Sequence, residues 1–312
     1  MDLRSRRMDA SGCGIQIGSS GPSFTVKSTL ISSSNLTELK VLTSTHRDTS
    51  ETGSAPAARF DHHIFADDRQ QDVIILHGGR QSQAGEKLKD TWLFDMAARQ
   101  WTSLPDAPVA ASNAAFMDGK LFTITGTSEL SCEVHTLDIG HSEEERQKKT
   151  LKWETIELPT NPLTPGPKPR EGGALLPVDT GLGRQYLVYI FGCRQALSEP
   201  SEKEAEQTTF YSDMWTLQLP SKSAKPMSWT DLKPAVIKDA IREKLGYDSG
   251  SYSWSEVDVQ PTEELVHEGK VHPGPRGFFG ADVTKDGKGV VLWGGLNAKG
   301  ENESDGWLIN LS

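Results

Sequence analysis

The chain has 312 residues, a formal net charge of −10 and 35% hydrophobic residues. Its negative charge argues against nucleic-acid binding, which needs clustered lysine and arginine side chains. The three cysteines are widely spaced and fit neither a disulfide framework nor a zinc ligand set. No apolar stretch has the length of a membrane span or follows the basic N-terminus as a secretory signal would, so we expect a cytoplasmic protein with no membrane partner.

The N-terminal part is the least regular. Residues 1–22 are rich in glycine, serine and charge, and we expect this segment to be disordered. Two segments with alternating apolar residues follow, at 24–31 and 36–42, and both are typical of strands. We expect residues 23–312 to form a single domain.

Four similar units follow one another from residue 58 onward. Each unit has an apolar strand that ends in glycine, at 73–79, 121–126, 186–192 and 290–295. In three units an Asp-x-Trp step opens the next strand: Asp90/Trp92, Asp213/Trp215 and Asp305/Trp307. The same three units begin with an arginine, namely Arg59, Arg170 and Arg276. The second unit has Ala110-Ala111-Ser112 in place of the arginine step, and Glu133 and His135 in place of Asp-x-Trp.

A tryptophan marks the outer strand of three units, at Trp101, Trp153 and Trp254. For the third of these, Met227-Ser228-Trp229 is an alternative outer strand. A repeat of about 50 residues built from short strands is typical of a β-propeller. Glycine permits backbone angles that are closed to other residues at the strand end, and the large aromatic fills the wedge between sheets.

This ordered set of features resembles the kelch repeat over residues 56–312. The resemblance implies an all-β fold, a kelch-type β-propeller. Kelch propellers usually have six or seven blades, whereas only four units are clear in this sequence. The sequence does not decide between a small ring and a ring of five or six blades. Because the last unit ends at its third strand, we expect an N-terminal strand, best placed at 36–42, to pair there and close the ring.

Two polar insertions have a predicted local structure. The segment 234–245 is predicted to be a helix, since Pro234 lies near its first turn and Gly246 follows its end. This helix either packs on its own blade, which we favour, or binds a partner. The charged run at 143–149 is predicted to be a solvated hairpin tip.

The sequence contains no recognisable catalytic motif, whether a phosphate loop, an HExxH pair or an ordered catalytic triad. His62 and His63 are neighbours on a strand, so their side chains point to opposite faces and do not share a metal. Glu133 and His135 share a face but occupy structural positions of the repeat. The copper ligands of galactose oxidase and the iron pattern of the plant specifier proteins are not matched, so we expect no metal and no cofactor.

Arginines supply the candidate ligand-binding residues. Arg59, Arg170 and Arg276 begin first strands, whereas Arg80 and Arg194 follow the glycines that end second strands. All five are expected near one mouth of the channel. For the first three we favour a structural role, in which they buttress neighbouring blades through loop carbonyls and acids. Arg80 and Arg194, with His62, Glu171 and Asn297 nearby, are the better candidates for binding a carboxylate-bearing ligand.

Two classes of function follow from these observations. Resemblance to stand-alone fungal galactose-oxidase-like kelch proteins implies a small-molecule protein of a secondary-metabolite pathway. It would be either an accessory protein or a cofactor-free tailoring enzyme of the isomerase, lyase or cyclase type. The alternative is a non-catalytic scaffold for protein–protein interaction, the common use of kelch domains. The sequence leaves open whether the chain is an enzyme and which ligand, partner or reaction it has.

Overall fold

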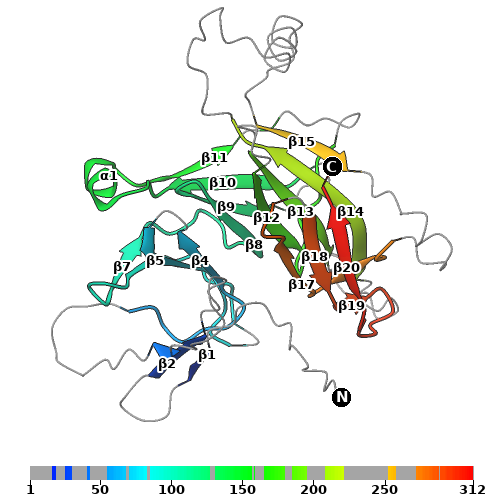
Figure 1. Cartoon of the computed structure of the whole chain (residues 1–312), viewed down its shortest axis with the longest axis horizontal. Helices are drawn as coiled ribbons and strands as arrows, with labels where there is room; N and C mark the ends of the chain where they lie inside the picture. The colour runs from blue at the N-terminus through cyan, green and yellow to red at the C-terminus, as the bar shows by residue number, and fades with distance from the viewer. Residues whose placement is uncertain are drawn as a thin grey trace, which may run out of the picture. The chain divides into compact units, whose positions relative to one another are not determined.

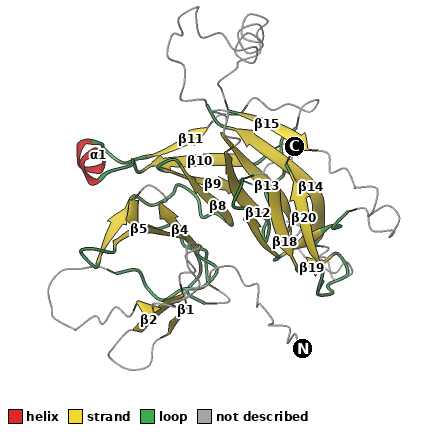
Figure 2. Ribbon diagram, in the orientation of Figure 1, coloured by secondary structure: helices red, strands yellow, loops and turns green. Residues whose placement is uncertain are grey.

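The structure, a computed structural model, describes residues 16–18, 25–29, 41–42, 55–67, 70–82, 85–126, 131–156, 158, 165–179, 185–194, 208–220, 252–257, 272–287 and 289–311. The chain divides into two compact units, which are described separately below. Unit 1 comprises Met1–Thr125 and Val134–Thr155, and unit 2 comprises Gly126–Glu133 and Ile156–Ser312. Among the described residues the secondary structure is almost entirely β (Figure 2).

Unit 1 contains two four-stranded sheets (Figure 1). The first consists of β4 (His63–Asp67), β5 (Gln70–His77), β6 (Thr91–Asp95) and β7 (Gln100–Leu104). The second consists of β8 (Asn113–Met117), β9 (Lys120–Thr125), β10 (Glu133–Asp138) and β11 (Trp153–Ile156). In both sheets each strand lies beside the strand that precedes it in the chain. Each sheet therefore corresponds to one predicted repeat unit.

Unit 2 contains the other two repeats. The third repeat forms a four-stranded sheet of β12 (Ala174–Asp179), β13 (Gln185–Arg194), β14 (Thr209–Gln218) and β15 (Ser253–Val257). The fourth forms a three-stranded sheet of β17 (Gly280–Val283), β18 (Gly289–Trp293) and β20 (Gly306–Asn310). Two short strands, β16 (Arg276–Gly277) and β19 (Leu296–Asn297), pair separately. The all-β architecture with four repeat sheets is confirmed.

The outer strand of the third repeat is settled by its pairing. β15 pairs with β14 over five residues, with Leu217 opposite Trp254. The prediction that Trp254 marks the outer strand is therefore confirmed. Residues 227–229, the alternative, lie outside the described residues.

Three strands are described in the N-terminal part: β1 (Gln16–Gly18), β2 (Thr25–Thr29) and β3 (Val41–Leu42). β1 lies within the segment that was expected to be disordered, and β2 confirms the predicted strand at 24–31. Of the closing strand expected at 36–42 the structure describes Val41–Leu42, which pair with β2. Residues 36–40 lie outside the described residues, so closure of the ring by this segment stays a prediction. A partner this close in sequence closes a shorter loop, which makes the pairing entropically less costly.

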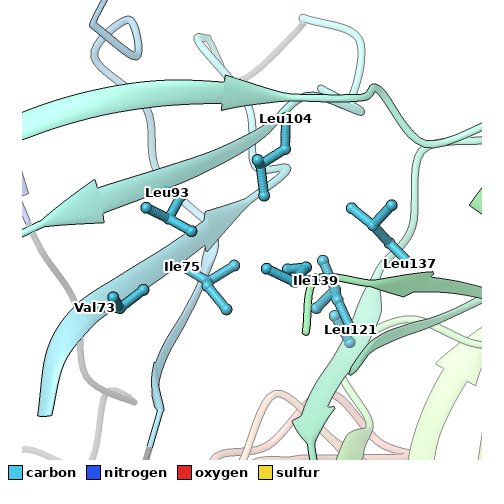
Figure 3. Packing of buried hydrophobic residues seen from close by; sticks show 8 residues of the cluster. Val73, Ile75, Leu93, Leu104, Leu121, Leu137 and Ile139 are labelled. Carbon is cyan, nitrogen blue, oxygen red and sulfur yellow. The ribbon is translucent and has the colours of Figure 1, made fainter. Parts of the chain in front are cut away.

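The core of unit 1 lies between its two sheets (Figure 3). Val73 and Ile75 are two positions apart on β5 and therefore point to the same face. They meet buried side chains of the same cluster: Leu93, Leu104, Ala114, Leu121, Leu137 and Ile139. Because the cluster draws on both sheets, burial of these side chains holds the two repeats of unit 1 together.

Unit 2 has an equivalent core. Buried side chains of the third repeat pack against buried side chains of the fourth: Val178, Val188, Ile190, Phe191 and Met214 against Val290, Leu292 and Ile309. On β18 and β20 only alternate residues take part, so the opposite face of the fourth sheet does not contribute to this core.

One helix is present among the described residues, α1 (Glu143–Lys148). It replaces the predicted hairpin tip, because Ser142 and Glu145 cap its first turn. The Ser142 hydroxyl accepts a hydrogen bond from the Glu145 amide (3.1 Å), and the Glu145 carboxylate accepts one from the His141 amide (2.8 Å). None of its residues is buried, so the predicted solvation is confirmed.

The other predicted helix, at 234–245, lies outside the described residues. In the described part of the chain no helix combines the length and apolar character that a bilayer crossing requires.

Candidate functional site

A buried arginine anchors the first repeat. Arg59 donates to both carboxylate oxygens of Asp90, at 2.6 Å and 2.7 Å. The same carboxylate accepts a hydrogen bond from the indole nitrogen of Trp92 (2.7 Å). Arg59 also donates to the carbonyl of Gly78 (3.0 Å), the glycine doublet's first residue. One guanidinium therefore ties the end of the second strand to the start of the third.

The third and fourth repeats have the same arrangement. Arg170 pairs with Asp213 and donates to the Phe191 carbonyl, and Trp215 donates to Asp213. Arg276 pairs with Asp305 and donates to the Gly294 carbonyl, and Trp307 donates to Asp305. We call each set an Arg–Asp–Trp unit. All three arginine side chains are buried.

The Arg–Asp–Trp units show the predicted hydrogen bonds of the arginines to carbonyls and acids. The acid that each arginine binds is the aspartate of its own repeat, where an acid of a neighbouring blade was expected. The reason is the strand order: the arginine precedes the first strand and the aspartate lies just before the third strand or in its first half, so the intervening antiparallel strand brings both to one end of the sheet. Burial would raise the pKa of Asp90, but hydrogen bonds from Arg59 and Trp92 hold it below its ordinary value.

The second repeat replaces the unit with a histidine. His135 is buried, and its two ring nitrogens lie 2.8 Å from the Thr125 hydroxyl and 2.9 Å from the Thr155 hydroxyl. Hydroxyls on both sides support the structural role favoured for His135. In the Ala110-Ala111-Ser112 step, which stands in place of the arginine step, the Ser112 hydroxyl accepts a hydrogen bond from the Lys87 ammonium. Sequence reasoning missed Lys87, which carries no repeating signal.

Two further histidines lie side by side in unit 1. His63 and His77 are opposite each other on β4 and β5, and His77 is opposite Thr91 on β6. Nδ1 of His77 lies 3.0 Å from the Thr91 hydroxyl, and its ring centroid lies 5.7 Å from that of Trp153. Burial lowers the pKa of His63 to about 4 and that of His77 to about 3, so both are neutral at pH 7. The sequence signal for His77 was a polar residue inside an apolar run.

His62 differs from these two. Among the described residues, neither of its buried ring nitrogens has a hydrogen-bond partner. Burial lowers its pKa, and the neighbouring Arg59 charge adds to this effect. His62 is thus a neutral imidazole beside a fixed cation.

Arg80 and Arg194 do not occupy equivalent positions, contrary to the expectation that both follow the strand-ending glycines in the same way. Phe60 bridges to Arg80, whereas the corresponding residue Glu171 bridges to Cys193. Arg194 therefore lies one position further along its strand than Arg80. Because successive residues on a strand face opposite sides, the two side chains leave their repeats in different directions. Both are half-buried.

The structure groups the sequence-predicted candidates by unit. In unit 1, the amide and carbonyl of Arg80 bind Phe60 (2.8 Å and 3.0 Å), which follows Arg59 and precedes His62 by two residues. In unit 2, Glu171 exchanges two backbone hydrogen bonds with Cys193, beside Arg194.

Asn297 is also in unit 2, opposite Arg276. Its amide nitrogen donates to Glu301 and Glu303, and its oxygen accepts from the amides of Lys299 and Glu301. These hydrogen bonds give Asn297 a role in its own turn. Whether it also binds a ligand stays a prediction.

Among the described residues, no group of three or more His, Cys, Asp or Glu side chains is placed to hold a metal ion. Cys132 and Cys193 are buried, and neither forms a disulfide bond in the described part of the chain. Burial raises the pKa of Cys132 to about 12, so this thiol does not ionise at neutral pH.

Comparison with known proteins identifies the fold. No protein-family model matches the chain, and no curated protein is similar to it in sequence. Its structure is similar to that of YjhT, a kelch-type propeller, with a TM-score of 0.52 over 95% of this chain and 77% of YjhT. The chain has the β-propeller fold. At 14% sequence identity, this likeness concerns the fold alone.

Proposed function

We propose that this propeller is of the kelch type and binds a small molecule that carries a carboxylate. Two observations support the kelch assignment: the Arg–Asp–Trp units recur at corresponding positions in three repeats, and YjhT is a kelch-type propeller. The double glycines Gly78-Gly79 and Gly294-Gly295 agree with it, since all four have positive φ angles.

The observation that carries the binding proposal is a division of roles among the arginines. Three of them are buried and paired with aspartate, so their charge is used within the fold. Arg80 and Arg194 do not belong to the Arg–Asp–Trp units. They lie at strand ends, and their side chains are only half-buried. Guanidinium groups bind carboxylates through two parallel hydrogen bonds, a geometry that the ammonium group of a lysine does not offer.

The reaction class we propose is cofactor-free acid–base chemistry, such as isomerisation, elimination or cyclisation, or simple binding as an accessory protein. His62 is the candidate proton acceptor, because neither of its ring nitrogens has a hydrogen-bond partner among the described residues. Burial and the Arg59 charge lower its pKa, so its imidazole is neutral before it accepts a proton. A role in a fungal secondary-metabolite pathway rests on the resemblance to stand-alone fungal kelch proteins, and fold-level analogy is its only other support.

A protein-interaction scaffold is the second candidate, and one observation favours it. On the fourth sheet Val291, Trp293 and Leu308 are exposed apolar residues on the face opposite the core. Val291 and Leu308 are directly paired across β18 and β20. Exposed apolar clusters of this kind are typical of contact surfaces.

The test is the double substitution Arg80→Ala/Arg194→Ala. Binding of small aromatic and aliphatic carboxylates is measured by titration calorimetry. Lys152→Ala/Lys299→Ala is the matched control, since it removes the same charge from exposed sites in the same two units. We expect the arginine variant alone to lose binding, at an unchanged melting temperature. Equal affinity in the arginine variant and the wild type would favour the scaffold.

A further inference from the structure

Phe278 has an unusual backbone conformation. Its φ angle is +58°, in the left-handed region that bulky residues rarely adopt. The corresponding residues of two other repeats, each two positions after the anchoring arginine, are Asp61 (φ 54°) and Gly172 (φ 60°). Aspartate and glycine are among the residues that tolerate this region. The three repeats with an anchoring arginine thus share a left-handed residue at this position, and among them only the fourth has an aromatic one.

Burial does not offset this strain. The Phe278 side chain is 62% exposed, so most of its apolar surface stays in water. Phe191 provides a contrast within the same unit. It also has a positive φ (46°), but it is fully buried and its ring packs on His272 and Phe279. Strain at Phe191 is compensated by packing, whereas strain at Phe278 is not.

The Phe278 ring is held in a defined place. The Phe278 amide donates to the Gly172 carbonyl (2.6 Å), and a Cβ atom at Gly172 would lie 2.8 Å from Cδ1 of the ring. The ring therefore packs over the backbone of Gly172, where the side chain of any other residue would collide with it. Gly172 follows Glu171, which is bridged to Cys193, and Arg194 is next along that strand. An exposed aromatic ring is thus fixed beside the segments that carry Glu171 and Arg194.

We propose that Phe278 is a binding residue whose ring stacks on a planar aromatic ring of the ligand, which makes the ligand an aromatic carboxylate. Residues with backbone strain that packing does not compensate are concentrated at binding sites. A fixed, exposed phenyl ring offers stacking with little further loss of side-chain freedom. The carboxylate part of this inference rests on the proposed function, whereas the aromatic part rests on Phe278 itself.

The test uses three probes and two variants. The probes are 1-naphthoate, cyclohexanecarboxylate, which has the charge without the aromatic ring, and 1-naphthalenemethanol, which has the ring without the charge. The variants are Phe278→Gly and, as the matched control, Asp61→Gly, which makes the same backbone change in another repeat. We expect Phe278→Gly to bind both naphthyl probes about threefold to tenfold more weakly than the wild type. Its affinity for cyclohexanecarboxylate and its melting temperature should not fall, and Asp61→Gly should bind like the wild type.

Equal naphthoate affinity in Phe278→Gly and the wild type would overturn the inference. The proposed function would still stand if Arg80→Ala/Arg194→Ala abolished binding of both carboxylates. Conversely, binding of naphthalenemethanol that is lost only in Phe278→Gly, with no effect of the arginine variant on naphthoate, would support the stacking role and reject the carboxylate proposal. A wild type that binds none of the three probes would overturn both.

Discussion

Arg170 forms a two-pronged ion pair with Asp213 while its side chain is shielded from water. Aromatic rings flank the guanidinium carbon, with ring centroids 4.1 Å away for Tyr211 and 5.1 Å away for Tyr189. The charge is thus compensated by a carboxylate and by two ring faces at once. Burial would raise the pKa of Asp213, but the hydrogen bonds from Arg170 keep it lowered.

Removing one partner of this pair should therefore be far worse than removing both. Asp213→Ala leaves the Arg170 charge buried and should lower the free energy of unfolding by about 3–5 kcal/mol. The double variant Arg170→Met/Asp213→Leu should recover part of this loss, because no unpaired charge remains. Urea unfolding measures both changes. Glu256→Ala, an exposed carboxylate on the same sheet, is the control and should change the stability by less than about 0.5 kcal/mol.

A double variant no more stable than Asp213→Ala would mean that packing, and not the unpaired charge, dominates this site. The same comparison at Arg59 and Asp90 in unit 1 then tells whether the conclusion holds for another Arg–Asp–Trp unit.

The repeat architecture was predictable because it depends on local, recurring signals. Glycine at strand ends, Asp-x-Trp and the leading arginine recur in the same order along the chain. Each set of these signals corresponds to one repeat of the structure. The structural role of Arg59, Arg170 and Arg276 followed from their recurrence. Their partners did not, because the pairing depends on which strand ends meet within one antiparallel sheet.

The candidate site was less predictable. The one-residue offset between Arg80 and Arg194 is present in the sequence, because Arg80 directly follows Gly79 whereas Cys193 stands between Gly192 and Arg194. The bridges Phe60–Arg80 and Glu171–Cys193 show that this offset is kept in the structure. The left-handed conformation of Phe278, in contrast, was not predictable, because phenylalanine gives no sign of a positive φ angle, whereas glycine does.

The pH dependence of stability should report on the buried histidines. His63 and His77 have folded-state pKa values of about 4 and about 3, below the unfolded value of about 6.5. Their contribution is therefore fully present above pH 6.5 and is lost as the pH falls towards 4 and 3. Within this window each histidine should lower the free energy of unfolding by about 1.4 kcal/mol per pH unit.

Urea unfolding between pH 7 and pH 4.5 measures this slope. His77→Asn removes one titrating group while its amide is still able to hydrogen-bond Thr91, so the slope should become shallower even though the variant is less stable at pH 7. An identical slope in His77→Asn and the wild type would show that His77 does not titrate on unfolding.

Thiol reactivity should separate the folded from the unfolded protein. Cys132 and Cys193 are both buried, and the raised pKa of Cys132, about 12, keeps its thiol protonated at pH 8. In a Cys13→Ser background, a disulfide reagent should therefore modify neither thiol rapidly until urea unfolds the chain. Rapid modification of one thiol without urea would indicate local opening of unit 2 around it.

Gly79 should be the glycine of the first repeat least tolerant of substitution. Its φ angle is +99°, and an added Cβ atom would lie 2.7 Å from the Phe60 carbonyl oxygen. That oxygen accepts the amide hydrogen of Arg80 (2.8 Å), so Gly79→Ala should displace Arg80 as well as strain the backbone. We expect a loss of about 2–4 kcal/mol in the free energy of unfolding, from strain and crowding together.

Gly300→Ala is the matched control. Gly300 also has a positive φ (76°), but an added Cβ atom would meet nothing within 4 Å. Strain alone should then lower the free energy of unfolding by about 1–2 kcal/mol. Urea unfolding of both variants separates crowding from strain, and carboxylate binding shows whether the position of Arg80 matters. If the two variants were equally destabilised, close approach of the Phe60 strand would not be the reason for glycine at position 79.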